Sequence, residues 1–228
     1  MLMLFGETVF IIKQLTRPDN NVMAHDAHIM LQISDSHLIG KGSERTCYVH
    51  PENSDQCIKI NHSSLTKQSD NELKYLTILL KRNISWQHIP KLYGVVQTNL
   101  GDGVVYDLIR DYDGEVSKTL AHYLTSETDI EEARRIVAAL QEFRDYLLSQ
   151  HIMVRDPNAT NFALQKYNQD KVRLVLIDGI GNANFAPMFN QLNWFVDMKI
   201  KRKWKHFERS LLNKHPHNKT LQQVLLAQ

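Results

Sequence analysis

Val-Arg-Asp-Pro-Asn-Ala-Thr-Asn-Phe, at residues 154–162, holds two of the three most informative residues of this sequence. It contains the carboxylate of Asp156 and, five positions later, the carboxamide of Asn161. The apolar run Leu-Val-Leu-Ile at 174–177 then leads directly to a second carboxylate, Asp178. Two carboxylates and a carboxamide in this order are the arrangement that holds a magnesium nucleotide beside an acceptor hydroxyl.

Each of these three residues has an expected role and a plainer alternative. Asp156 is the candidate general base for the acceptor hydroxyl, and Pro157 biases it toward the extended conformation that suits a loop carboxylate. Asn161 and Asp178 are candidate ligands of Mg²⁺, which takes few protein oxygens and keeps phosphate oxygens and water for the rest. The alternatives are a loop cap at Asn161 and a turn residue at Asp178. The apolar strand before Asp178 favours the metal site.

Four residues upstream stand in the order that the same chemistry requires: Gly40, Gly42, Lys59 and Glu72. Glycines between two strands let backbone N–H groups approach phosphates closely. Lys59 lies between two isoleucines of a strand, so its ammonium points away from them and toward the glycine turn. It can bridge nucleotide phosphates if Glu72, on the following helix, fixes its direction. Each of these residues also has a plainer alternative when it is taken singly. The glycines can form a hairpin turn, Lys59 can be a solvated surface lysine, and Glu72 can complement the helix dipole.

The composition is that of an ordinary globular chain of 228 residues, with 43% hydrophobic and 23% charged side chains. Disorder and a membrane protein are therefore not indicated. The net charge of +2 gives no chain-wide attraction to nucleic acid, so no nucleic-acid partner is expected. Cys47 and Cys57 are predicted to be buried free thiols on consecutive strands, which favours a reducing cytoplasm. Residues 1–13 fail as a signal peptide, and no transmembrane segment is expected.

The pattern of apolar residues predicts an antiparallel sheet with one inserted helix in the first half and mainly helices in the second. Thr128 or Asp129 can cap the longest helix, with Glu131 and Glu132 in its first turn. Strands are expected at 31–33, 37–39, 46–50, 56–60, 91–97, 103–109, 162–165 and 172–177, and helices at 70–82, 117–124, 129–150, 192–212 and near 221.

These elements predict an α+β fold in four parts. Residues 1–30 are an N-terminal extension, and 31–109 form a small lobe built on an antiparallel sheet. Residues 110–116 are polar and contain a glycine, which suits a hinge. Residues 117–228 form a reduced, mainly helical lobe.

Five further stretches of the sequence are specific when taken together. They are Ile-Gly-Lys-Gly-Ser-Glu-Arg-Thr-Cys-Tyr-Val-His-Pro-Glu (39–52), Cys-Ile-Lys-Ile (57–60), Glu-Leu-Lys-Tyr (72–75), Ile-Pro-Lys-Leu-Tyr-Gly (89–94) and Val-Tyr-Asp-Leu-Ile-Arg-Asp-Tyr-Asp-Gly (105–114). Across about residues 38–178 the chain resembles the protein-kinase-like superfamily, and through these five stretches it more closely resembles the bacterial PhoP regulatory network protein YrbL family.

The resemblance implies a two-lobed protein-kinase-like fold with ATP in the cleft and Mg²⁺ as its ion. It implies that the adenine edge meets the chain around Leu108, Ile109 and Asp111. It also implies that Gly40, Gly42 and Lys59 contact the phosphates, with Glu72 as the partner of Lys59. Asp156 would be the catalytic carboxylate, and Asn161 and Asp178 would be the magnesium ligands.

The departures from the superfamily pattern bear on activity and substrate. Arg45 replaces the third glycine of the phosphate loop, and Asn158 stands where protein kinases place a lysine near the transferred phosphate. These changes leave a second hypothesis open, a catalytically inert nucleotide-binding pseudokinase that acts as a regulatory module. Gly-Ile-Gly follows Asp178 in place of Phe-Gly, and only fifty residues remain. We therefore expect the acceptor to be a small molecule, a sugar or a lipid headgroup rather than a protein.

The stretch 199–209 gathers six basic residues among aromatic and apolar ones. The plainer interpretation is an amphipathic helix that packs on the larger lobe with a solvated basic face. The alternative is contact with an anionic surface, which would place the protein peripherally at the inner membrane rather than free in the cytoplasm.

Overall fold

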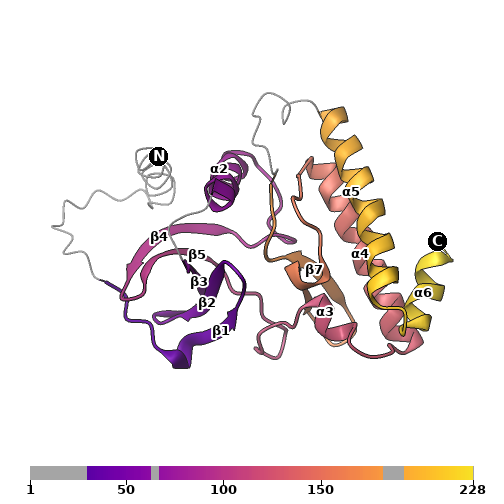
Figure 1. Cartoon of the computed structure of the whole chain (residues 1–228), viewed down its shortest axis with the longest axis horizontal. Coiled ribbons are helices and arrows are strands. Elements are labelled where there is room, and N and C mark those ends of the chain that lie inside the picture. The colour runs from indigo at the N-terminus through magenta and orange to yellow at the C-terminus, as the bar shows by residue number, and fades with distance from the viewer. Residues whose placement is uncertain (1–29, 63–66, 182–192, 228) are drawn as a thin grey trace. The chain divides into compact units, whose positions relative to one another are not determined.

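The computed structural model describes residues 30–62, 67–181 and 193–227, and shows an α+β fold (Figure 1). The extension expected at 1–30 lies outside these ranges except for its last residue. The chain divides into two compact units. Unit 1 comprises the described residues up to Asn83 together with Lys91–Leu108, and unit 2 comprises Ile84–Pro90 and the described residues from Ile109 onward.

Unit 1 is built on a five-stranded sheet in which every neighbouring pair is antiparallel, in the order β1-β2-β3-β5-β4. The antiparallel sheet predicted from the alternating pattern is confirmed, although β3 begins earlier than expected. The strands are β1 (Leu38–Lys41), β2 (Arg45–His50), β3 (Asn53–Asn61), β4 (Leu92–Thr98) and β5 (Gly101–Asp107).

The strand expected at 31–33 is not formed as a strand. Leu31 makes one isolated parallel bridge to Thr98. The side chain of Asn99 then holds the segment, since its Oδ1 accepts from the backbone N–H of Ile33 at 2.7 Å and its Nδ2 donates to Ile33 O at 3.0 Å. Backbone pairing is limited to Leu31, whose N–H donates to Gln97 O at 2.9 Å and whose carbonyl accepts from Asn99 N at 3.1 Å, and the Asn99 side chain takes its place at Ile33. The segment closes over a buried cluster of Leu31, Ile33, Ile58, Ile60 and Val105.

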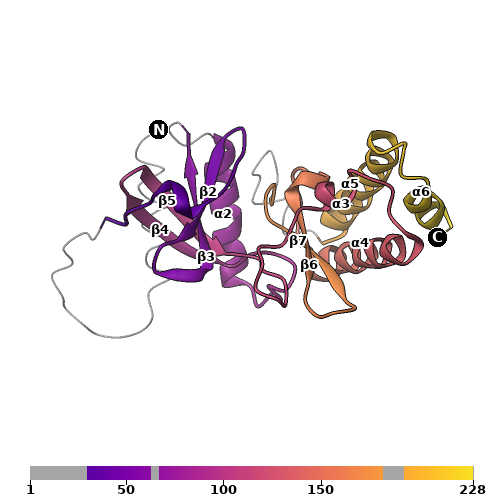
Figure 2. The same ribbon diagram turned by 90° about the horizontal axis from the view of Figure 1, so that it is seen from below.

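Helix α2 (Lys67–Lys81) is the inserted helix of unit 1 and lies beside the sheet in both ribbon views (Figures 1 and 2). The helical spacing of Leu73, Leu76 and Leu79 predicts a buried stripe, and all three are almost fully buried. Helix α2 therefore packs by hydrophobic burial, with Glu72 carried on it as a buried charge.

Unit 2 is organised around α4 (Ile130–Gln150), as the sequence predicts. Asp129 caps the helix by accepting a hydrogen bond from Glu132 N, and His151 ends it in the left-handed conformation at φ 49°. Phe143 on α4 packs against an aromatic core that contains Phe162, Trp204 and Phe207. The other elements are β6 (Phe162–Lys166), β7 (Val172–Leu176), α5 (Asn193–Lys214) and α6 (Lys219–Leu226).

The helix expected at 117–124 is shorter than predicted. Helix α3 spans only Leu120–Tyr123 and is capped by Thr119. The residues before it are drawn into extended pairing instead, because Ser117 N donates to Ile109 O at 3.0 Å and Arg110 bridges Val116. Pairing between distant backbone groups overrides the local helical pattern here.

Candidate functional site

Asp156 and Asn161 lie at the two ends of one short loop and contact each other. Asn161 closes the 3-10 turn η2 (Ala159–Asn161), which Asn158 caps through Thr160 N. The Nδ2 of Asn161 donates to Asp156 O at 2.9 Å and reaches the Asp156 carboxylate oxygen Oδ2 at 3.4 Å. The carboxamide therefore fixes both the backbone and the side chain of Asp156.

Asp178 follows the end of β7 and joins the same group through backbone hydrogen bonds. Ile177 N donates to Asn161 O at 2.8 Å, and Asp178 N approaches the same oxygen at 3.3 Å. The Asp178 carboxylate accepts from Gly179 N through Oδ1 at 2.6 Å, which sets its direction locally. Asp178 thus stands beside Asn161 although the two are distant along the chain.

Gly179 is the residue around which the three side chains gather. Its carbonyl accepts from Arg155 N at 2.7 Å and from Asp156 N at 3.3 Å. Its φ is +78°, and a Cβ there would lie 3.0 Å from Asp156 O and 3.3 Å from Asn161 Nδ2. Both the backbone conformation and the close approach require glycine. The structure thus brings Asp156, Asn161 and Asp178 together.

The donor atoms of this cluster fit a magnesium ion bound mainly through a nucleotide. Nδ2 of Asn161 is hydrogen-bonded to Asp156, so Oδ1 of Asn161 is the atom that can bind a metal ion. Asp178 supplies a carboxylate. Within residues 30–62, 67–181 and 193–227, no group of three or more His, Cys, Asp or Glu side chains could hold a metal on its own. Mg²⁺ needs no such cage, since it binds through one or two carboxylates and phosphate oxygens.

The two candidate phosphate-binding glycines, Gly40 and Gly42, lie on the hairpin of β1 and β2. Gly40 pairs with Cys47, and Gly42 N donates to Arg45 O at 2.8 Å to close the turn. Nothing lies within 4 Å of the position that a Cβ would take at Gly40. The strand backbone at Gly40 is therefore accessible on that side.

The structure gives Glu72 a partner that the sequence did not indicate. Both terminal nitrogens of Arg45 lie 3.3 Å from the carboxylate oxygens of Glu72, and both side chains are largely buried. Lys59 lies in β3 opposite Cys47 and Val104, and its Nζ is 4.9 Å from the ring centroid of Tyr106. The Lys59–Glu72 pairing implied by the resemblance stays a prediction.

The residues expected to meet adenine have part of their backbone engaged. Leu108 N donates to Asp55 O at 2.8 Å within unit 1. In unit 2, Ile109 O accepts from Ser117 N and Asp111 N donates to Glu115 O. The contact with adenine implied by the resemblance stays a prediction.

Comparison with known proteins places the whole set of candidate residues within one family. The family model of the PhoP regulatory network protein YrbL matches residues 31–212. The YrbL protein of Escherichia coli strain K12 is 33% identical over 184 residues, which cover 78% of this chain and 86% of that protein. The YrbL protein of Shigella flexneri matches to the same extent. The chain belongs to the PhoP regulatory network protein YrbL family.

The match to the YrbL family ends close to the end of α5, so the basic helix is part of the family region rather than an appendage. Its residues Val196, Ile200 and Trp204 are buried, which agrees with the predicted packing face. Within the three described ranges, no helix is both long and apolar enough to cross a bilayer.

Two charged residues at the predicted site are not indicated by the sequence pattern. Arg45 pairs with Glu72, as described, and Lys203 on α5 donates a hydrogen bond to the backbone oxygen of Arg155, the residue before Asp156. The sequence marks Arg45 only as a replacement for glycine. Lys203 stood among several similar lysines, and nothing in the local pattern distinguishes it from them.

Proposed function

We propose that this member of the YrbL family is an ATP- and magnesium-dependent phosphotransferase with the two-lobed protein-kinase-like fold. Its acceptor would be the hydroxyl of a small molecule, a sugar or a lipid headgroup. The observation that carries the proposal is the gathering of Asp156, Asn161 and Asp178 around Gly179. A base and two oxygen ligands are the set that this reaction uses.

In unit 2, Asp156 would accept the proton of the acceptor hydroxyl. Its side chain is exposed, so an acceptor can reach it, and Asn161 holds it in place. Asn161 Oδ1 and the Asp178 carboxylate would hold Mg²⁺. The bound ion would supply neutralisation of the charge on the phosphate oxygens.

In unit 1, Gly40, Gly42 and Lys59 would contact the nucleotide phosphates. The open space at Gly40 supports this role, because phosphate oxygens can approach the backbone there. Adenine would meet the chain around Leu108, Ile109 and Asp111. Lys59 is half-buried beside Tyr106, which limits the directions in which its ammonium can point.

The segment after Asp178 supports a small acceptor. Ile180 forms an antiparallel bridge with Val154, and Gly181 N donates to Met153 O at 2.9 Å. The chain after the metal-ligand position therefore turns back along the segment that leads to Asp156. Gly-Ile-Gly follows Asp178 in place of Phe-Gly, and the Ala-Pro-Glu motif of protein kinases does not occur in the sequence printed after it.

Nucleotide binding without catalysis, in a regulatory pseudokinase, is the competing function, and the Arg45–Glu72 pair favours it. A glutamate engaged by Arg45 is less available to hold Lys59 toward a phosphate. A phosphotransferase and a pseudokinase would both bind the nucleotide, but only the phosphotransferase would turn it over.

Thermal unfolding with ATP and Mg²⁺, combined with measurement of ADP release, tests both. A ligand that binds only the folded state at about a hundred times its Kd stabilises it by about 2.7 kcal/mol. We expect the wild type to be stabilised and to release ADP. Asp156→Asn should retain the stabilisation and lose turnover by about a hundredfold or more. Asp178→Asn should lose the magnesium-dependent part of the stabilisation.

Asp145→Asn, an exposed carboxylate on α4, is the matched control and should behave as the wild type. Stabilisation without ADP release in the wild type would support the pseudokinase. No stabilisation by ATP with Mg²⁺ would refute both nucleotide functions.

We propose in addition that α5 contacts an anionic lipid surface. Its exposed side carries Trp194 and Met198, which are 67% and 50% exposed. At 3.6 residues per turn they share that side with the exposed basic residues Lys201, Arg202, Lys205 and Arg209. An aromatic and apolar end beside a row of cations is typical of a helix that lies in a membrane interface.

Vesicle co-sedimentation tests the lipid proposal. Binding is expected to vesicles that contain phosphatidylglycerol, to weaken with salt, and to be absent from pure phosphatidylcholine. Lys201→Glu combined with Lys205→Glu should abolish it. The control, Lys118→Glu with Lys171→Glu, changes the charge equally at exposed positions outside α5. Equal binding by both double variants would contradict the proposal.

A further inference from the structure

Helix α5 attaches at two points to the segment that carries Asp156. Asp197 Oδ1 lies 2.8 Å from His151 Nδ1, at the start of that segment. Lys203 Nζ donates to the backbone oxygen of Arg155, immediately before Asp156. With the 3.6-residue repeat, Asp197 and Lys203 flank the buried stripe of α5 on opposite sides. The helix therefore holds the segment at both ends.

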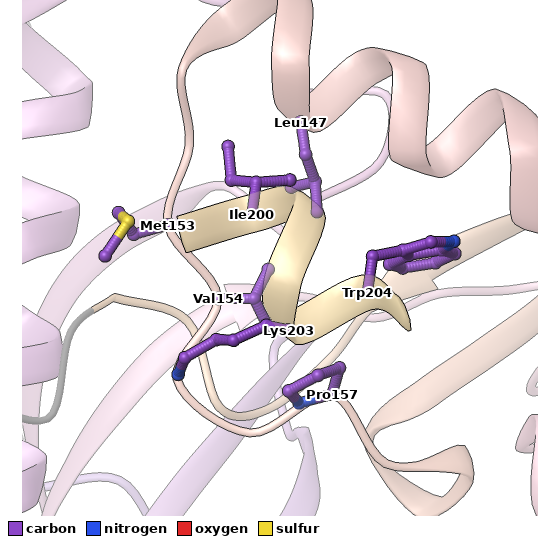
Figure 3. A pocket seen from close by; sticks show the side chains of 7 residues that line it. All are labelled: Leu147, Met153, Val154, Pro157, Ile200, Lys203 and Trp204. Atoms are coloured by element: carbon purple, nitrogen blue, oxygen red, sulfur yellow. The ribbon is translucent and has the colours of Figure 1, made fainter. Parts of the chain in front are cut away.

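The side chain of Lys203 is packed against neighbouring residues along its length. Its stem lines a small, mainly apolar pocket together with Val154, Pro157, Ile200 and Trp204, as Figure 3 shows. In that view the side chain runs from α5 to the loop. Ordering the Lys203 side chain in this pocket costs more side-chain entropy than an exposed lysine elsewhere on α5 would lose. The hydrogen bond to Arg155 O must offset that cost.

Asp156 is the acidic group that acts on Lys203. Burial lowers the pKa of Lys203, and the charge of Asp156 opposes that shift, whereas Lys199, Arg155 and Arg202 add to it. The ammonium contacts the backbone oxygen of Arg155, the residue directly before Asp156, and the opposing effect of Asp156 on the pKa agrees with that placement. A half-buried ammonium is retained because a carbonyl and a carboxylate compensate for its lost hydration.

The loop itself lacks a cation on the side that follows Asp156. Asn158 is neutral, and its side chain accepts from Thr160 N as the cap of η2. Phosphoryl transfer brings anionic oxygens toward the Asp156 carboxylate, and like charges repel unless a cation is fixed nearby. Lys203 reaches this loop from a helix more than forty residues later in the sequence.

We propose that Lys203 is a positioning residue for Asp156: it fixes the backbone at Arg155 and keeps a positive charge beside the carboxylate. The positioning stands on the contacts of α5 alone. Its effect on catalysis rests on the phosphotransferase function proposed above. Helix α5 would then contribute to the function of the site as well as to packing.

Backbone hydrogen exchange tests the positioning without any need for activity. Arg155 N and Asp156 N both donate to Gly179 O, so their exchange reports how firmly the loop is held. In Lys203→Met, which keeps the apolar stem, we expect exchange in a peptide covering 152–161 to be about tenfold faster, as for loss of a charged hydrogen bond. Lys203→Gln keeps a donor and should change exchange less. Lys171→Met, at an exposed position outside α5, should match the wild type.

Measurement of ADP release with ATP and Mg²⁺ tests whether the positive charge of Lys203 contributes to catalysis. Both Lys203→Met and Lys203→Gln should lower kcat by about tenfold or more with KM for ATP nearly unchanged, whereas Lys203→Arg should retain most of the activity. A role in packing alone predicts normal kcat in Lys203→Gln.

The two proposals fail in different ways. If the wild type neither binds nor turns over ATP, the phosphotransferase fails, and hydrogen exchange alone decides the role of Lys203. If exchange in Lys203→Met equals that in Lys171→Met, the positioning role of Lys203 is overturned whatever the activity. Should Lys203→Met not fold, Lys203→Gln and Lys203→Arg provide the same comparison through kcat.

Discussion

The carboxylate of Glu72 accepts hydrogen bonds from both terminal nitrogens of Arg45, each at 3.3 Å. Arg45 opens β2 and Glu72 lies on α2, so the pair ties the helix to the sheet within unit 1. The carboxylate is only 4% exposed, and the arginine 12%. A fork of two parallel hydrogen bonds is the geometry that arginine provides and lysine cannot. Arg45 therefore has a structural function at a position where the resemblance indicated only a bulky replacement.

Replacing Arg45 by methionine should destabilise the protein strongly. The change leaves Glu72 buried without this partner, and breaking a buried ion pair from one side costs about 3 kcal/mol or more. Urea unfolding measures the loss. The double change Arg45→Met with Glu72→Leu should recover most of it, because no charge is then left buried.

Lys59→Met is the matched comparison for this pair. If Arg45 is the main partner of Glu72, Lys59→Met should cost about 1 kcal/mol or less. The reverse order, with Lys59→Met the more damaging change, would show that Lys59 holds Glu72 in solution.

Gly179→Ala should damage the candidate metal site more than the fold. A Cβ at this position meets Asp156 O and Asn161 Nδ2 in a residue whose φ is +78°. The conformational cost of about 1–2 kcal/mol is expected at any such glycine, including Gly101 with φ +113° and open space around it. Only Gly179→Ala should also reduce stabilisation by ATP with Mg²⁺, as seen by thermal unfolding. Equal ligand responses in the two variants would show that the contacts around Gly179 do not set the site.

His88 should make the stability of the protein fall below neutral pH. Burial is the main cause that lowers its pKa, against the opposing effects of Leu174 O and Glu142. Below about pH 6.5 the unfolded chain gains a proton that the folded chain resists, so the free energy of unfolding decreases as pH falls, until the folded pKa is passed. The slope from this residue is at most about 1.4 kcal/mol per pH unit.

Thermal unfolding between pH 7.5 and pH 5, at about half-unit steps, measures this slope. His88→Asn removes the titration while keeping a donor toward Leu174 O, and should flatten the profile. His206→Asn, at an exposed histidine of α5, should leave it unchanged. A profile equally steep in His88→Asn would mean that other groups cause the loss.

Cys57 should resist alkylation in the folded protein. It is a free thiol, 4% exposed, and a hydrogen bond with Cys47 together with burial raises its pKa well above the usual range. The thiolate is the reactive form, so both accessibility and ionisation disfavour reaction. Iodoacetamide labelling read by peptide mass should modify half-buried Cys47 first, and Cys57 only with urea present. Labelling of Cys57 at the rate of Cys47 without urea would contradict the burial.

The local elements of the fold were predictable where periodicity and caps agree. The apolar spacing and the Asp129 cap predicted α4, and the alternating pattern predicted four of the five strands of the sheet closely. Predictions failed where distant groups decide the backbone. The segment at 31–33 is held by the Asn99 side chain, and the start of the helix expected at 117–124 is paired with Ile109–Arg110.

The residue types of the candidate site and their order follow from sequence alone, because the spacing from Asp156 to Asn161 and the strand before Asp178 are local properties. Which charged groups meet depends on the tertiary structure. Arg45 meets Glu72 in a fork, and Lys203 among the lysines of α5 reaches Arg155 O. Contacts of this kind depend on the packing of elements far apart in the chain, and periodicity carries no information about which of several similar side chains will be brought into reach.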